Sequence, residues 1–400
     1  MGNGLYLKVV IALLASLIIS FISTPIVKQF ANRVGAIDVP TDSRRVHDHP
    51  IPRMGGLAIF LGFVLSVVLF ADVTLQVRGI LFGSLLVVIV GVIDDIVPLP
   101  AWVKFLLQIV AALIAVFHGV RIEIIANPNI FSDAEYLIFG GLSIPITVIW
   151  IVAVTNSVNL IDGLDGLAIG VSTIATVTML VIALVVSDGN VALILAALAG
   201  ACIGFMPYNL NPAELFMGDT GALLLGYVLA TMSVVGLFKF FAIISFVVPF
   251  IVLGLPIFDT AFAFFRRIFS GQNPMKPDRK HFHHRLIDMG LTQKQAVAIL
   301  YGISGILGLI AILIITTGEV RAIMVLITLI IVVLMAAFIM NIKKTDTQGP
   351  EDGERAETDP EGSATEDPQS GPVIPEGSER ETETETPDDA EGVPEEENEL

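Results

Sequence analysis

Apolar segments of about 17–25 residues recur along most of this chain, and that length matches the hydrocarbon thickness of a lipid bilayer. Hydrophobic residues make up 54% of the 400 residues and charged residues only 15%, which leaves too little polar surface for a soluble fold. The sequence therefore predicts an all-α polytopic membrane protein with about eleven transmembrane helices. We place these helices at 5–27, 55–72, 78–93, 102–120, 144–160, 166–187, 191–208, 220–238, 241–265, 295–317 and 321–341.

The formal net charge of −17 belongs to one end of the chain. From Thr345 to Leu400 there are 21 Asp or Glu and 2 Lys or Arg, whereas residues 1–344 hold 18 and 20. The last 56 residues lack aromatic side chains and are rich in Pro, Gly, Glu and Thr, so they bury too little apolar surface to offset the entropy of ordering. We expect an integral-membrane domain over 1–344 and a disordered acidic tail over 345–400.

Basic residues indicate the side of each loop, because Lys and Arg accumulate in cytoplasmic loops. With the N-terminus outside, 15 of the 20 Lys and Arg in residues 1–344 fall on the inner side and 5 on the outer side. This orientation places the acidic tail in the cytoplasm. The more polar stretch 121–143 is predicted to form a short strand pair or loop outside the bilayer.

Polar and ionisable residues form five clusters, and all five fall on the side assigned to the cytoplasm. They are RRVHDHPIPRMGG (44–56), GVIDDIVP (91–98), NSVNLIDGLDGLA (156–168), YNLNPAELFMGDTGA (208–222) and PDRKHFHHRL (277–286). Ionisable groups near lipid are costly, so their collection on one side favours a function over chance. We predict one cytoplasmic active site assembled from several loops.

Aspartates dominate the second and third clusters. Asp94 and Asp95 end the third span before two prolines, and the pair is compatible with a general base beside a tuning charge, a metal contact or a solvated helix end. Polar residues recur every three positions at Asn156, Asn159, Asp162 and Asp165, and such oxygen ligands suit Mg²⁺. Asp165 is also a candidate N-cap of the next helix.

The fourth cluster places Asp219 between glycines at the start of the eighth span. A helix begins there, so we expect its unpaired backbone N–H groups to face an anion, while Asp219 serves as a metal carboxylate or as a simple cap. Asn209 and Phe216 supply amide and aromatic groups that suit a nucleobase.

The fifth cluster gathers cations and three of the six histidines within seven residues: Arg279, Lys280, His281, His283, His284 and Arg285. The HFHH order could bind zinc, but a zinc site needs further Cys or His, and Cys202 lies in a distant apolar run. Flanking cations favour phosphate binding instead.

Carboxylates that suit a metal ion and cations that suit phosphate lie on one face, and this combination favours phosphoryl transfer from a diphosphate substrate. Neither a P-loop nor a kinase-type glycine-rich motif occurs in the sequence, so ATP chemistry is disfavoured. An ion-coupled transporter is the alternative from another class. Transporters place ionisable groups near the bilayer midplane, commonly in repeated halves, and this chain has no internal repeat.

At these motifs the sequence resembles the polyprenyl-phosphate N-acetylhexosamine-1-phosphate transferase family, glycosyltransferase family 4. The resemblance covers residues 1 to about 340, and NSVNLIDGLDGLA with FMGDTG carries most of it. It implies a multi-pass enzyme of the bacterial plasma membrane. Such an enzyme transfers a sugar 1-phosphate from a UDP-sugar to a polyprenyl phosphate in the bilayer and releases UMP.

The resemblance also implies roles for single residues. Asp94, Asp95 and Asp162 match catalytic positions, and Asp219 and Asp162 match the ligands of Mg²⁺ (or Mn²⁺). The pair reads DDIVP, which lacks the third aspartate of a DDxxD triad. Substrate contacts are implied for Asn159, Asp165, Asn209, Phe216, Arg279, His281, His283 and His284.

Two branches of that family differ in the sugar. The branch that uses UDP-MurNAc-pentapeptide typically has three consecutive histidines and P-T-M-G-G, whereas this chain has HFHH and PRMGG. We therefore expect UDP-GlcNAc and undecaprenyl phosphate as substrates, in the first membrane step of teichoic-acid or another envelope polysaccharide, with phospho-MurNAc-pentapeptide transferase as the alternative. No nucleic-acid partner is expected, and a homodimer stays open.

We predict that deletion of the residues after Lys344 leaves activity largely intact, because the acidic tail has too few apolar residues to pack against the membrane domain. Transferase activity per folded molecule, compared between full-length and truncated protein, checks this. A large loss in well-expressed truncated protein would show that the tail does more than aid solubility.

Overall fold

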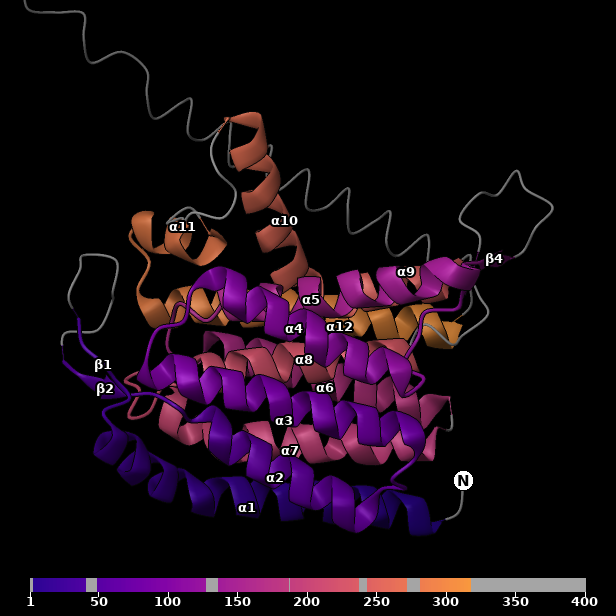
Figure 1. The fold of residues 1–400 in the computed structure, drawn as a ribbon, viewed down its shortest axis with the longest axis horizontal. Coiled ribbons are helices and arrows are strands. Elements are labelled where there is room, and N and C mark those ends of the chain that lie inside the picture. Colours follow the sequence, from indigo (N-terminus) through magenta and orange to yellow (C-terminus); the bar gives the residue numbers. More distant parts are fainter. Residues whose placement is uncertain are drawn as a thin grey trace, which may run out of the picture. The chain divides into compact units, whose positions relative to one another are not determined.

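The computed structural model describes residues 3–40, 49–126, 136–186, 188–236, 243–271 and 281–317, all within Met1–Ala337, the first of two units into which the chain divides. The fold is mostly helical, and most of the longer helices run side by side (Figure 1). They are α1 (Asn3–Val34), α2 (Gly56–Phe70), α3 (Leu75–Ile96), α4 (Ala101–Phe117), α5 (Ser143–Leu160), α6 (Leu167–Val185), α7 (Gly189–Asn209), α8 (Gly218–Gly236) and α12 (Gln293–Thr317).

Seven helices of the described part are long and apolar enough to cross a membrane, namely α1, α3, α5, α6, α7, α8 and α12. The chain is thus a helical, multi-pass membrane protein. The spans predicted at 55–72 and 102–120 form the shorter apolar helices α2 and α4. The eleventh span, 321–341, and the tail, 345–400, lie outside the described residues, so the total of eleven and the boundary near residue 344 stay predictions.

The predicted span 241–265 is wrong as one continuous helix. Its described residues form α9 (Ile243–Val252) and α10 (Gly254–Phe269), with a break at Leu253. Pro256 has no N–H to donate to the carbonyl of Val252, and Gly254 eases the change of direction. As a result, α10 points away from the other helices (Figure 1). Mean hydropathy over a window does not report such a bend.

Helix α8 forms the centre of the bundle. Every residue from Thr220 to Gly236 is buried, and α8 packs mainly against α3 and α5. Glycines permit a close approach at its start: a Cβ added at Gly56 of α2 or Gly91 of α3 would overlap the backbone of Gly221 or Thr220. The first turn of α8, which carries Asp219, is therefore fixed against two neighbouring helices.

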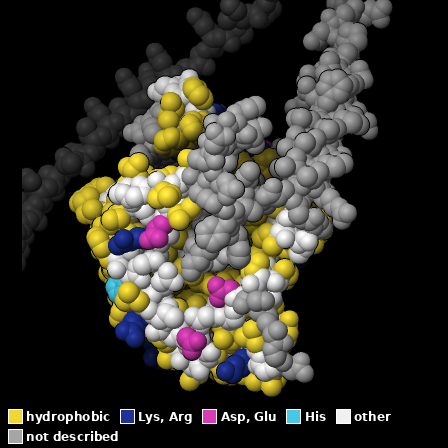
Figure 2. All heavy atoms as spheres, turned by 90° about the vertical axis from the view of Figure 1, so that its right-hand side faces the viewer, with side chains coloured by type: hydrophobic (Ala, Val, Ile, Leu, Met, Phe, Trp, Pro, Cys, Tyr) yellow, Lys and Arg dark blue, Asp and Glu magenta, His cyan; other side chains and the backbone are white. Residues whose placement is uncertain are grey.

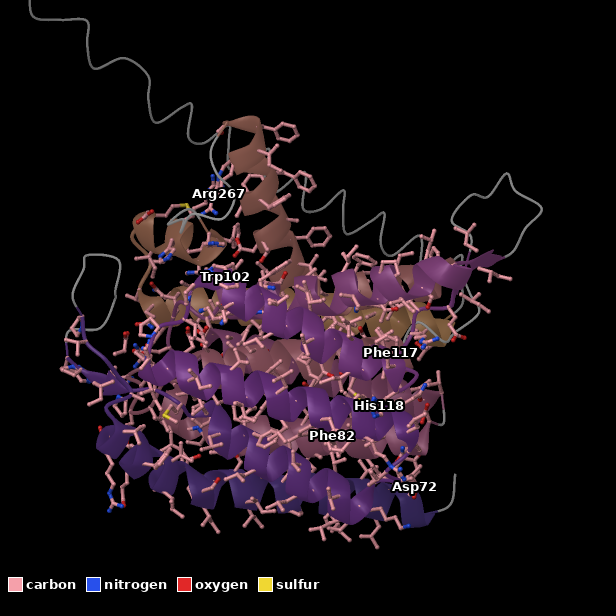
Figure 3. All side chains as sticks on the ribbon, viewed as in Figure 1. Asp72, Phe82, Trp102, Phe117, His118 and Arg267 are labelled. Atoms are coloured by element: carbon pink, nitrogen blue, oxygen red, sulfur yellow. The ribbon has the colours of Figure 1, made fainter. Side chains whose placement is uncertain are left out.

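Short strand pairs and loops occupy the two ends of the bundle. β1 (Ile37–Asp38) pairs with β2 (Ile51–Pro52) at the end where α11 (Phe282–Asp288) also lies, and β3 (Ile124–Ala126) pairs with β4 (Tyr136–Ile138) at the other end (Figure 1). The predicted strand pair within 121–143 is confirmed. Helix α4 runs from Trp102 towards Phe117 and His118, which lie at the β3–β4 end with Asp72 (Figure 3).

Candidate active site

A cavity of about 290 Å³ opens at the end of the bundle that carries β1, β2 and α11. All five polar clusters contribute to its wall, so the structure brings together loops that are far apart in the sequence. The wall consists of Asp38, Arg53, Asp95, Asn159, Asp162, Gly163, Leu164, Asp165, Asn209, Phe216, Gly218, Asp219 and His284.

The opposite end of the bundle differs in its charge pattern. Figure 2 views that end, and on its visible described surface the acidic side chains lie apart from one another, one of them beside a basic side chain. The visible described surface of this end thus differs from the cavity wall, where five aspartates gather.

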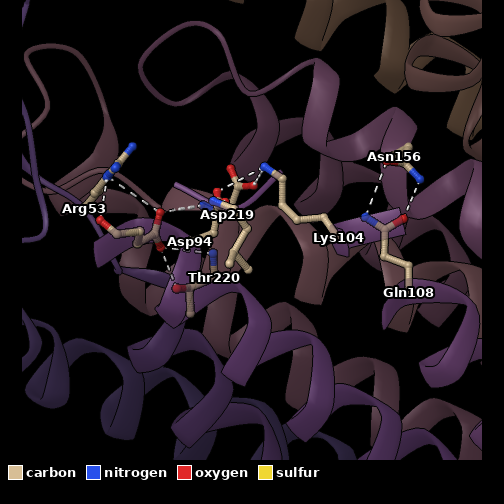
Figure 4. Close-up of polar contacts among 9 residues, drawn as sticks. Arg53, Asp94, Lys104, Gln108, Asn156, Asp219 and Thr220 are labelled. Carbon is tan, nitrogen blue, oxygen red and sulfur yellow. Dashed lines mark hydrogen bonds and ion pairs between the residues drawn. The ribbon is translucent and has the colours of Figure 1, made fainter. Parts of the chain in front are cut away.

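Asp95 binds the start of α8. Its Oδ1 accepts a hydrogen bond from the backbone N–H of Asp219 (3.0 Å), and its Oδ2 accepts from the backbone N–H (3.1 Å) and the hydroxyl (2.6 Å) of Thr220 (Figure 4). Arg53 donates from Nε to the Asp95 carbonyl at 3.0 Å. Asp95 is only 1% exposed. The expectation that these helix N–H groups face a substrate anion is wrong, because the Asp95 carboxylate already accepts their hydrogen bonds.

Asp94 has different partners. Its Oδ1 accepts from the backbone N–H of Leu99 at 2.7 Å, and its Oδ2 accepts from the Lys104 ammonium at 3.1 Å. The same ammonium lies 2.8 Å from Oδ2 of Asp219 and so bridges the two carboxylates (Figure 4). Lys104 is one of the 15 basic residues assigned to the inner side, and no partner was predicted for it. A signal in the sequence could have identified Lys104, because it is a lone cation near the start of a largely apolar helix.

The third cluster divides between a helix end and a loop. Asn159 lies in the last turn of α5 beside the Asp219 carboxylate, whereas Asp162 and Asp165 follow the helix. Asp165 Oδ2 accepts from the side-chain amide of Asn211 (3.0 Å) and the backbone N–H of Ala213 (3.1 Å). The predicted N-cap role of Asp165 is wrong, since its carboxylate ties the loop before α6 to the loop before α8.

Asp162 is half-buried in this loop, outside the candidate spans. Desolvation, together with the negative charges of Asp219, Asp95 and Asp165, raises the pKa of Asp162 to about 8. Among the described residues of the wall there are five aspartates and one arginine. The cavity therefore has a surplus of acidic groups that a bound cation would stabilise.

Backbone hydrogen bonds join the PRMGG segment to the loop before α8. Phe216 donates its N–H to Pro52, Gly55 donates back to Phe216, and Gly56 donates to Met217, each at 2.9 Å. Asn209 is buried and donates from Nδ2 to the carbonyl of Leu215 at 3.0 Å. These bonds hold Arg53 and Phe216 at the cavity wall.

The three histidines of the fifth cluster occupy different positions. His284 lines the cavity, whereas His281 and His283 are buried behind it. The His283 ring packs so closely on Gly163 that a Cβ there would overlap it. Burial and the neighbouring His284 lower the pKa of His283 to about 3, so this ring is neutral. Arg279, the remaining predicted substrate contact, lies outside the described residues.

The predicted metal ligands Asp162 and Asp219 both line the cavity. Within the described ranges, however, no three His, Cys, Asp or Glu side chains are arranged as ligands of one metal ion. The donor set instead fits Mg²⁺ held by one or two carboxylates together with substrate phosphates. The Lys104 ammonium, 2.8 Å from Oδ2 of Asp219, already neutralises part of the charge at this position.

Comparison with known proteins places the chain in a family. The family Glycosyl transferase family 4 matches residues 77–237, which include every aspartate of the cavity wall except Asp38. A Bacillus subtilis (strain 168) protein named "Probable undecaprenyl-phosphate N-acetylglucosaminyl 1-phosphate transferase" is 42% identical over 309 residues, which cover 76% of this chain and 85% of that protein. The chain belongs to glycosyl transferase family 4. The predicted family is thereby confirmed.

Other relatives of this family 4 chain carry related names. "Decaprenyl-phosphate N-acetylglucosaminephosphotransferase" of Mycobacterium tuberculosis (strain ATCC 25618 / H37Rv) is 34% identical over 316 residues, covering 72% of this chain and 78% of that protein. "Phospho-N-acetylmuramoyl-pentapeptide-transferase" of Staphylococcus aureus (strain MW2) is 32% identical over 282 residues, covering 65% and 83% respectively.

We predict that Asp95→Asn destabilises the protein by about 1–3 kcal/mol, because the amide NH₂ would face a backbone N–H or the Thr220 hydroxyl and leave a buried donor unpaired. Asp94→Asn is the matched control: its NH₂ can donate to the adjacent Asp219 carboxylate, so the loss should be smaller. Thermal unfolding in detergent measures both. Equal midpoints for the two variants would contradict the capping role of Asp95.

Proposed function

We propose that this protein transfers N-acetylglucosamine 1-phosphate from UDP-GlcNAc to undecaprenyl phosphate, giving undecaprenyl-diphosphate-GlcNAc and UMP. The observation that carries the proposal is the carboxylate-lined cavity at one end of an apolar helical bundle, where a water-soluble and a membrane-bound reactant can meet. The 42% identical relative, named for this activity, supports the choice of substrates.

The reaction exchanges one phosphoanhydride bond for another. An oxygen of the lipid phosphate forms a bond to the phosphorus that carries the sugar, and the bond between that phosphorus and the bridging oxygen of UMP breaks. UMP leaves with the electron pair. Both reactants are anionic, so the aspartates of the cavity need cations beside them to bring the reactants together.

We propose that Mg²⁺ is one of these cations and that Asp219 and Asp162 hold it. Mn²⁺ is the alternative metal. When bound, the metal would neutralise charge on the diphosphate. The acidic surplus of the wall and the Lys104 ammonium at 2.8 Å from Asp219 support this assignment. Asn159, beside Asp219, would hold the carboxylate in orientation.

The two adjacent aspartates have separate roles in this scheme. Both carboxylate oxygens of Asp95 accept hydrogen bonds from the start of α8, and Asp95 thereby positions Asp219. Asp94 shares the Lys104 ammonium with Asp219 and is free of the α8 backbone, so we assign Asp94 the exchange of a proton with the lipid phosphate. Asp165, Asn209 and Phe216 would contact the uridine, and His284 the sugar diphosphate.

We further propose that the cavity faces the cytoplasm of a bacterial cell and that the product starts an envelope polysaccharide such as a teichoic acid. The excess of Lys and Arg assigned to that side, 15 of 20 in residues 1–344, supports this orientation.

Purified protein is expected to release UMP from UDP-GlcNAc only when both undecaprenyl phosphate and Mg²⁺ are present. Parallel assays with UDP-GalNAc and UDP-MurNAc-pentapeptide should give much lower rates. Asp219→Asn and Asp162→Asn should fold and lose turnover, because each removes a carboxylate proposed to hold the metal. Absence of UMP from folded wild-type protein would reject the function, and preference for the pentapeptide donor would move the protein to the alternative branch.

Magnesium affinity is expected to rise with pH. Asp162, with a pKa of about 8, is mostly protonated at neutral pH, and metal binding must displace that proton. The apparent affinity should therefore increase up to about tenfold per pH unit below pH 8 and level off above it. Calorimetric titration without substrates measures this, and Asp162→Asn should bind weakly with little pH dependence. A pH-independent wild-type affinity would remove Asp162 from the metal site.

A further inference from the structure

Asp259 is the only acidic residue of α10 and lies outside the cavity wall. Its Oδ2 lies 3.0 Å from Nδ1 of His281, and its Oδ1 accepts from the backbone N–H of Phe282 at 2.8 Å. The side chains of Asp259 and His281 are only 7% and 8% exposed. The carboxylate is therefore buried with a defined partner for each oxygen.

The rest of α10 makes this carboxylate unexpected. The helix exposes large apolar side chains, including Phe258, Phe262, Phe265 and Phe269, the last of them 86% exposed. A carboxylate in such a helix carries a desolvation cost that only specific hydrogen bonds offset. The bonds to His281 and Phe282 both tie this carboxylate to the start of α11. A lone Asp in an apolar run is a signal that sequence analysis could have used.

From His281, ring contacts lead to the cavity. The His281 and His283 rings are nearly parallel, with centroids 5.8 Å apart, and the His283 and His284 centroids are 4.3 Å apart. His283 packs on Gly163, next to Asp162, and His284 lines the cavity. The position of His281 therefore influences where the other two rings lie.

We propose that Asp259 is a positioning residue for the transfer reaction, which acts through His281 and the start of α11 to hold His284 in the cavity. This inference rests on the proposed function. A carboxylate can only accept, so Nδ1 of His281 carries the hydrogen that it donates to Asp259. Asp259 thus sets the orientation of the His281 ring and the donor role of its Nδ1.

Asp259→Asn separates this role from simple helix capping. The amide oxygen can still accept from Phe282, while the amide NH₂ faces Nδ1 of His281 and imposes the opposite tautomer. We expect kcat/KM for UDP-GlcNAc to fall about 10–100-fold, the range seen when a residue that orients a functional histidine is lost, with an unchanged unfolding midpoint. Asp288→Asn, an exposed carboxylate on α11, is the matched control and should retain wild-type rates.

A double-variant cycle tests whether Asp259 acts through His281. His281→Asn keeps a donor at the position of Nδ1 but removes Nε2. If the two residues act together, the double variant Asp259→Asn/His281→Asn loses no more activity than His281→Asn alone. Multiplicative losses, or wild-type rates in Asp259→Asn, would overturn the proposal. Asp259→Asn could fail to fold by itself. The double variant then serves instead, because its two side-chain amides can pair, and wild-type rates in the double variant would also overturn the proposal.

Hydrogen exchange provides a readout that does not depend on turnover. Asp259→Ala should accelerate exchange of the backbone amides at the start of α11, whereas Asp288→Asn should not. Unchanged protection in Asp259→Ala would overturn the positioning role even if no donor supports UMP release. Absence of UMP release by the wild type, with α11 exchange accelerated as expected, would instead reject only the proposed reaction.

Discussion

The Asp95 carboxylate at the start of α8 is the interaction on which the rest of the site depends. Its oxygens bind the N–H groups of Asp219 and Thr220, and so they join the end of α3 to the first turn of the most buried helix. A helix start leaves several N–H groups without intrahelical partners, and in a buried location each needs an acceptor. The bond that stabilises the central helix thereby also places Asp219 at the cavity.

Charge balance is the second constraint. Five aspartates of the described wall lie around a cavity of about 290 Å³, with Arg53 as the one cation among these wall residues. Desolvation and, after it, the neighbouring carboxylates raise the free energy of the ionised form of Asp162, and its pKa rises to about 8. Lys104 relieves part of this repulsion between Asp94 and Asp219. In the proposed reaction, cations that enter with the anionic substrates would offset the remaining repulsion.

Much of the site could be predicted because membrane topology restricts where loops go. Asn159, Asp162, Asp165, Asn209, Phe216, Asp219 and His284 all line the cavity, as expected from loops on one side of a bundle. No specific role was predicted for Lys104, Asp259 or Arg53. Each of these side chains interacts with a partner that is distant in the sequence, or at least not adjacent to it. His281 and His283 were expected at the substrate, yet their burial behind His284 depends on how α10 and α11 pack.

The sequence by itself determined the class of fold and the composition of the site. Apolar segments of bilayer length leave helices as the only structure that satisfies their backbone groups, and polar clusters must then gather at helix ends. Tertiary structure alone decided the different hydrogen-bond partners of Asp94 and Asp95, the break at Leu253 and the pairing of Asp259 with His281. Neighbouring residues with the same chemistry differ only in the partners to which packing exposes them, and local sequence does not encode those partners.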